Sequence, residues 1–169
     1  MNTTLRTAIA AGLLASATNT IAGDIRTQTV RFESAGDTLV GTLYLPEGAT
    51  ATEAVVVTGA WMTVKEQMAG RYAQELAERG IAALAFDFRG WGESAGRPRA
   101  FENPERKTQD IVAASRFLQQ QLPEARISGL GICASAGYMA DAATRTPILK
   151  RVALVAPWLH DADIVDQVY

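Results

Sequence analysis

The chain has 169 residues, of which 48% are hydrophobic, and a formal net charge of -2. This length suffices for a single globular domain with an ordinary core, and the net charge gives no electrostatic case for a nucleic-acid binder, which carries a clustered basic face. One cysteine and one histidine exclude an internal disulfide and a zinc site built from several thiolates, and we expect no metal.

Residues 1–23 combine one early arginine, an apolar run and small residues near the end. This order is typical of a secretory signal peptide, with cleavage after Ala17, Ala22 or Gly23, and it predicts a periplasmic or secreted protein. A disordered or helical N-terminal arm of a cytoplasmic protein is the alternative. The apolar run is too short to span a membrane, so no stable membrane span is expected.

Residues 25–33 and 38–45 each alternate between two faces and predict a β-hairpin. Four later runs are apolar on both faces, as buried parallel strands are: 54–58, 81–86, 126–132 and 152–156. Helical patterns cover about 65–79, 103–122 and 134–144. This order predicts an α/β fold with right-handed crossovers and an antiparallel leading edge.

The helices carry periodic stripes. The first has Met68, Tyr72 and Leu76 at helical spacing. The second opens with Asn103 as its expected N-cap. Its expected apolar face consists of Ile111, Ala114, Ser115, Leu118 and Leu122.

The segment GLGICASAG, residues 129–137, contains two candidate nucleophiles. A nucleophile elbow is a sharp strand-to-helix turn with small residues two positions away on each side. Cys133 fits between Gly131 and Ser135, and Ser135 fits between Cys133 and Gly137. The apolar run ends at Ile132, which places the turn at Cys133 and favours it over Ser135. A third interpretation is that Cys133 is a small, buried, inert residue.

The same letters fit a second motif. Residues 129–134 match the G-x-G-x-x-G/A dinucleotide fingerprint between a strand and a helix. Against this Rossmann-type alternative, the motif comes late in the chain, and the next strand does not end in an acid that could hold a ribose.

Two further loops follow strands. In FDFRGWGES, residues 86–94, Asp87 and Arg89 can fix a tight loop by charge-assisted hydrogen bonds, which makes it mainly a structural turn. Arginines at 89, 97 and 99 cluster, but Glu93 and Glu102 lie among them, which predicts a solvated loop. In TGAWMT, residues 58–63, the backbone N–H groups of Ala60 or Trp61 could form an oxyanion hole with that of Ala134.

Together, the hairpin, the TGAW and DFRGWGES loops and the elbow resemble the α/β-hydrolase superfamily over about residues 25–158, and the G-x-C-x-S form looks most like its dienelactone-hydrolase-like branch. The resemblance implies helices on both faces of a mostly parallel sheet. It also implies hydrolysis or transfer of an acyl group from an ester, lactone or thioester through a covalent acyl-enzyme, with a small-molecule substrate and no cofactor. A non-catalytic binding protein on the same fold is the alternative.

In that family the acid and the histidine follow further strands beyond the elbow. We therefore expect residues 24–169 to be the N-terminal part of one domain that lacks its final strands and is inactive alone. His160 lies just past the last predicted strand, where we expect an ordinary loop residue rather than the base. Asp161 and Asp163 are expected to cap a helix.

Overall fold

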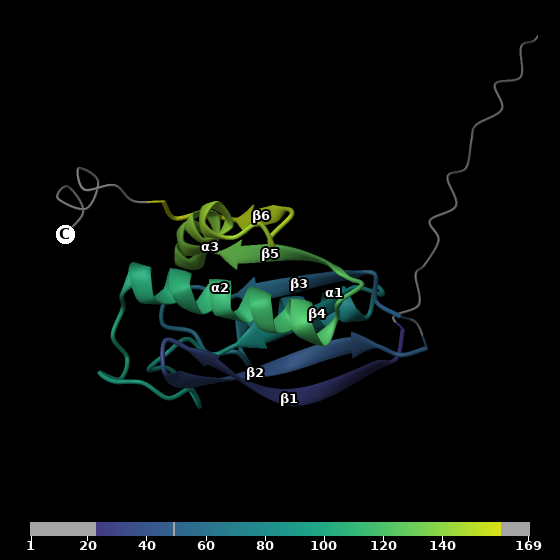
Figure 1. Ribbon diagram of the computed structural model, residues 1–169, viewed down its shortest axis with the longest axis horizontal. Coiled ribbons are helices and arrows are strands. Elements are labelled where there is room, and N and C mark those ends of the chain that lie inside the picture. Colours follow the sequence, from purple (N-terminus) through teal and green to yellow (C-terminus); the bar gives the residue numbers. More distant parts are fainter. Residues whose placement is uncertain (1–22, 49, 160–169) are drawn as a thin grey trace, which may run out of the picture.

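The computed structural model describes residues 23–48 and 50–159. Six strands form one sheet in the order β1-β2-β4-β3-β5-β6. The strands are β1 (Ile25–Ser34), β2 (Asp37–Pro46), β3 (Glu53–Thr58), β4 (Ala82–Phe86), β5 (Arg126–Ile132) and β6 (Val152–Val155). The helices are α1 (Met68–Ala77), α2 (Pro104–Gln121) and α3 (Ala134–Arg145) (Figure 1).

The leading hairpin is antiparallel, as expected, and joins the rest of the sheet through antiparallel pairing of β2 with β4. Its two-residue turn has positive φ at both Ala35 (49°) and Gly36 (88°), the conformation that matches the twist of the flanking strands. The other four strands are mutually parallel. This strand order differs from that of a Rossmann sheet, so the dinucleotide-binding alternative is wrong at the level of the fold.

Helices cover both faces of the sheet, because successive side chains of a strand point to opposite faces. On one face, Val56 of β3 and Leu84 of β4 pack with Ile111 of α2 and Met139 of α3. On the other, Val57 and neighbouring alanines of β4 pack with α1. Figure 1 shows α2 crossing the first of these faces. The central strands are therefore buried on both sides, which explains their continuous apolar runs.

Helix α1 forms, but of its expected apolar stripe only Leu76 packs against the core, where it is partly buried. Met68 is 40% exposed and Tyr72 is 37% exposed, whereas Ala69, Ala73 and Ala77 are buried. A Cβ built on Gly70 would lie 2.5 Å from the carbonyl oxygen of Lys65. The alanines pack against the sheet, and the missing side chain of Gly70 leaves room for the turn at Lys65 and for the Tyr44 hydroxyl of β2, which would lie 3.1 Å from that Cβ.

Helix α2 follows the prediction more closely. The Asn103 side chain accepts a hydrogen bond from the backbone N–H of Arg106 (2.9 Å) and caps the helix. The expected face packs inward, with Leu122 partly buried. Among the described residues, no helix is both long and apolar enough to cross a membrane.

The expectation of a solvated arginine segment is wrong for Arg89. Its guanidinium is buried and lies 2.8 Å from a carboxylate oxygen of Asp110 on α2. The other carboxylate oxygen accepts the backbone N–H of Arg89 (2.9 Å), and Ser34 donates a third hydrogen bond (2.6 Å). Asp110 therefore ties the loop after β4 and the end of β1 to α2.

Candidate active site

The turn between β5 and α3 is sharp and strained at Cys133. This residue has φ 57° and ψ -120°, a conformation that side-chain-bearing residues rarely adopt. Its N–H donates to Val155 (2.9 Å), and its carbonyl oxygen accepts from Ala136 (3.1 Å) and Trp158 (3.2 Å). Hydrogen bonds on both sides hold the strained backbone in place and leave the thiol half-buried at the carboxyl end of β5.

Gly131 allows β5 and α3 to meet below this turn. A Cβ there would lie 2.7 Å from the carbonyl oxygen of Ser135, and 2.8 Å from the Cα of Ala136 and the Cβ of Met139. Two of these three atoms belong to the backbone, so no side-chain movement could make room. The small residue expected before the nucleophile is therefore a steric requirement.

The Ser135 side chain is buried and hydrogen-bonded to the backbone of the turn. Its side chain is 1% exposed, and its hydroxyl both accepts from the N–H of Ile132 and donates to the carbonyl oxygen of Ile132, each at 3.1 Å. Of the two candidate nucleophiles, the geometry favours the half-buried Cys133.

The expected oxyanion residues reach the same edge of the sheet. Thr58 at the end of β3 pairs in register with Gly131 of β5, so Ala60 and Trp61 follow directly beside the elbow. The carbonyl oxygen of Ala60 accepts from the backbone N–H (3.3 Å) and hydroxyl (2.7 Å) of Thr63, which closes this loop into a tight turn. Ala134 is the first residue of α3.

Trp158 also lies at this site, although the sequence analysis did not single it out. Besides its hydrogen bond to Cys133, its indole ring lies 5.8 Å from that of Trp61, tilted by 49°. Each tryptophan comes three residues after the end of its strand, Trp61 after β3 and Trp158 after β6. This equal offset on parallel strands was a signal in the sequence that could have identified the pair.

The loop after β4 is held from within by Asp87. Its carboxylate accepts from the backbone N–H (2.8 Å) and ammonium (2.9 Å) of Lys65, and from the backbone N–H of Glu93 (2.9 Å). A Cβ at Gly92 would overlap this carboxylate at 2.2 Å. The prediction of a structural turn fits these contacts, and Asp87 carries the charge-assisted bonds expected of it.

Glu66, Asp87 and Glu93 bring carboxylate oxygens within 4.8 Å of one another, as metal ligands would. The ammonium of Lys65, however, contacts all three. Burial disfavours its charge, but the hydrogen bonds to these carboxylates outweigh that effect and raise the pKa of Lys65. A cation of the protein itself thus contacts all three carboxylates and offsets one of their three negative charges.

A second polar cluster joins the start of α2 to α3. The Lys107 ammonium binds Glu102 (2.8 Å) and lies 4.7 Å from the ring centroids of both Phe88 and Trp91. The hydroxyl of Tyr138 donates to the other oxygen of Glu102 (2.9 Å). Burial lowers the pKa of Lys107. The pKa of Tyr138 is raised, mainly by burial and also by the hydrogen bond to Glu102. Sequence analysis missed this cluster because its members come from three separate segments.

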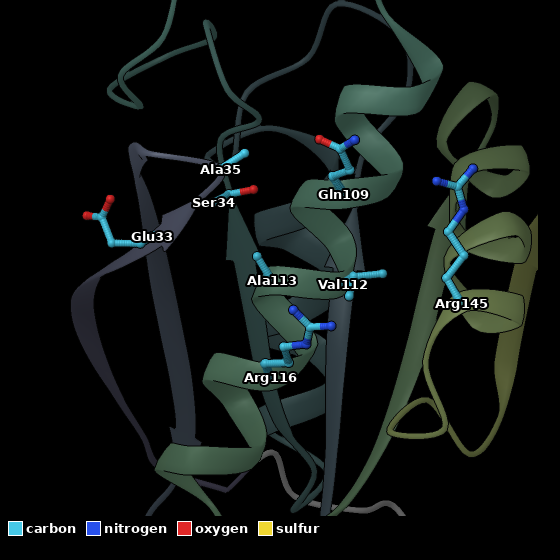
Figure 2. Close-up of a pocket in the computed structure, with 8 residues that line it drawn as sticks. All are labelled: Glu33, Ser34, Ala35, Gln109, Val112, Ala113, Arg116 and Arg145. Carbon is cyan, nitrogen blue, oxygen red and sulfur yellow. The ribbon is translucent and has the colours of Figure 1, made fainter.

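Away from the elbow, an open pocket of about 390 Å³ lies beside α2. Figure 2 shows its lining, which includes Ser34 at the end of β1 and Arg145 on α3. The hydroxyl of Ser34 is bound to Asp110, and the guanidinium of Arg145 is bound to Glu105 (2.7 Å) and Asp141 (2.6 Å). The pocket lining contains neither Cys133 nor Ser135, so it does not compete with the elbow as a candidate site.

Comparison with known proteins agrees with this geometry. The family model for the serine aminopeptidases S33 matches residues 52–168. The chain belongs to the S33 family of α/β hydrolases. The predicted fold is therefore confirmed, while the dienelactone-hydrolase-like branch stays a prediction.

Three relatives illustrate the similarity. A crystal structure of the hypothetical protein PA2218 from Pseudomonas aeruginosa superimposes with a TM-score of 0.76 at 34% identity, covering 89% of this chain and 49% of that one. The uncharacterized protein YcjY of Escherichia coli is 39% identical over 70% of this chain and 40% of its own. The thiohydrolase aneE of Aspergillus aculeatus is 39% identical over 49% of this chain and 26% of its own. The chain thus spans less than half the length of these relatives.

Several predictions concern segments outside the described residues. The signal peptide falls almost entirely within residues 1–22, and His160, Asp161 and Asp163 fall within 160–169. These assignments stay predictions.

Proposed function

We propose that Cys133 is the nucleophile of an acyl hydrolase or acyl transferase acting on an ester, lactone or thioester. The observation that carries the proposal is the half-buried thiol on a strained strand-to-helix turn. Hydrogen bonds from the backbone of Cys133 to neighbouring residues hold this turn in place. Membership of a hydrolase family and similarity to a thiohydrolase support the reaction class.

In this mechanism the thiolate of Cys133 attacks the acyl carbonyl carbon. A C–S bond forms and the carbonyl π electrons move to oxygen, where the N–H groups of Ala134 and of Ala60 or Trp61 stabilise the oxyanion. Collapse expels the alcohol or thiol, which takes up a proton. Water, or a second acceptor, then attacks the thioester and regenerates the thiol. No metal or organic cofactor is needed for these steps.

Efficient turnover requires a base, which typically contributes about 10²- to 10⁴-fold. The N-terminus of α3 favours the thiolate, but such a dipole contributes typically under ~1 kcal/mol at an exposed site. We therefore propose that this chain alone can be acylated once at Cys133 but shows no specific turnover above its Cys133→Ala and His160→Ala controls.

The test is p-nitrophenyl acetate hydrolysis by the 169-residue chain, with Cys133→Ala, Ser135→Ala and His160→Ala variants. We expect a stoichiometric release of p-nitrophenolate that Cys133→Ala abolishes and Ser135→Ala largely retains. The reverse pattern would transfer the role to Ser135. Sustained turnover lost in His160→Ala would make that residue the base, and no acylation in any form would favour the non-catalytic binding protein.

A further inference from the structure

The loops on either side of the elbow meet above it. Strands β3 and β6 both pair with β5, one on each side. Neighbouring strands lie about 4.8 Å apart, so β3 and β6 are separated by roughly 10 Å. Trp61 and Trp158, which follow these two strands, nevertheless bring their ring centroids to 5.8 Å. The two rings must therefore lean toward each other across the carboxyl end of β5, where Cys133 follows.

The position of Trp158 is fixed by the elbow itself, because its backbone N–H donates to the carbonyl oxygen of Cys133 (3.2 Å). Both rings keep accessible surface: Trp61 is 43% exposed and Trp158 is 37% exposed. Apolar neighbours extend the surface, since Met62 is 62% exposed and Leu159 is 53% exposed. Leu159 also contacts α3, with its Cδ2 at 3.5 Å from the position of a Cβ on Gly137.

We propose that the Trp61–Trp158 pair is the acyl-binding surface of the site and selects substrates whose acyl group carries an aromatic ring or a similar flat π system. This inference rests on the proposed role of Cys133. Trp158 follows β6 and is hydrogen-bonded to the backbone of Cys133, and the ring of Trp61 lies near that of Trp158, so on this proposal a group attached to a carbonyl at the thiol meets the two indoles. Aromatic rings gain from edge-to-face or offset contact with indole beyond the burial of apolar area, whereas saturated groups of equal size gain from burial alone.

The test compares three reagents that alkylate the thiol by displacing iodide: iodoacetamide, N-phenyl iodoacetamide and N-cyclohexyl iodoacetamide. The last two have substituents of similar size, and each rate is divided by that of the same reagent with N-acetylcysteine. On the 169-residue chain we expect the normalised alkylation rate of the phenyl reagent to exceed that of the cyclohexyl reagent by roughly two- to tenfold. Mass spectrometry after proteolysis confirms modification at Cys133.

The variants locate the preference. Trp61→Ala and Trp158→Ala should each bring the phenyl-to-cyclohexyl ratio toward one, and Trp158→Phe should keep part of it if the alanine variant folds poorly. Tyr72→Ala, which removes an equally exposed aromatic side chain on α1, should leave the ratio unchanged. Circular dichroism checks folding of each variant.

Three outcomes overturn the inference: equal enhancement of the phenyl and cyclohexyl reagents, a ratio insensitive to both tryptophans, or tryptophan variants in which all three reagents accelerate equally. The last outcome would make the pair a simple cover. Alkylation needs neither an oxyanion hole nor a base, so a phenyl preference without acylation by p-nitrophenyl acetate would contradict the proposed function and leave the aromatic surface standing. Acylation without a phenyl preference would support the proposed function and contradict the aromatic acyl-binding surface.

Discussion

Replacement of Gly131 by alanine should separate strand β5 from helix α3. The new Cβ would lie 2.8 Å from the Cα of Ala136. This is about 0.7 Å closer than the ~3.5 Å at which carbon atoms pack comfortably. Because backbone atoms of α3 cannot rotate away, the helix must shift as a body. Overpacking of this kind costs about 1–3 kcal/mol.

Alanine also lowers the conformational entropy of the unfolded chain, which stabilises the folded state by about 0.4–1 kcal/mol. We therefore expect Gly131→Ala to lower the free energy of unfolding by about 1–2 kcal/mol. Gly137 provides a matched control within α3, because its nearest neighbour would be an ordinary 3.5 Å from the new Cβ. Gly137→Ala should raise the free energy of unfolding by roughly 0.5–1 kcal/mol through the lower entropy of the unfolded chain.

Urea unfolding followed by far-ultraviolet circular dichroism measures both changes. The free energies of unfolding of the two variants should differ by about 2 kcal/mol. A difference of this size changes the ratio of folded to unfolded protein by roughly 30-fold. The helix shift should also displace the turn, so Gly131→Ala should slow iodoacetamide labelling at Cys133 while Gly137→Ala should not. A Gly131→Ala variant as stable as Gly137→Ala would refute the close approach of β5 and α3.

Three further outcomes follow from the described contacts. Cys133→Gly should be more stable than Cys133→Ala by about 1 kcal/mol, since glycine adopts positive φ without strain; equal urea midpoints would contradict the strain. Asp110→Ala should cost about 3–5 kcal/mol, because it takes the nearest carboxylate away from the buried guanidinium of Arg89; a loss below 1 kcal/mol in urea unfolding would show that water replaces the carboxylate. Burial and the bond to Glu102 raise the pKa of Tyr138, so the folded chain keeps this phenol protonated where the unfolded chain ionises it, and stability should fall as pH rises through 10. Tyr138→Phe should flatten that fall relative to Tyr72→Phe in urea titrations at pH 8 and 10.5, and identical slopes would contradict the assignment.

Much of this fold could be predicted from local patterns. The continuous apolar runs identified the four parallel strands because a strand buried on both faces needs no alternation. Asn103 identified the start of α2, since a side chain that satisfies an orphan N–H acts within one turn of its own position. The strained turn at Cys133 could be predicted for the same reason: Gly131 and Cys133 lie two residues apart, and the turn is a local event.

Contacts between distant segments decided the rest. The apolar stripe of α1 was only a partial guide, because the face of the helix that packs against the sheet consists mainly of alanines, with Leu76 beside them. Arg89 looked solvated until α2 placed Asp110 against it. The tryptophan pair depends on strand order: residues 61 and 158 meet because β3 and β6 are both neighbours of β5. Local sequence thus determined the elements and the turn that presents the thiol, whereas the sheet topology, which depends on pairing between residues far apart in the chain, decided what surrounds it.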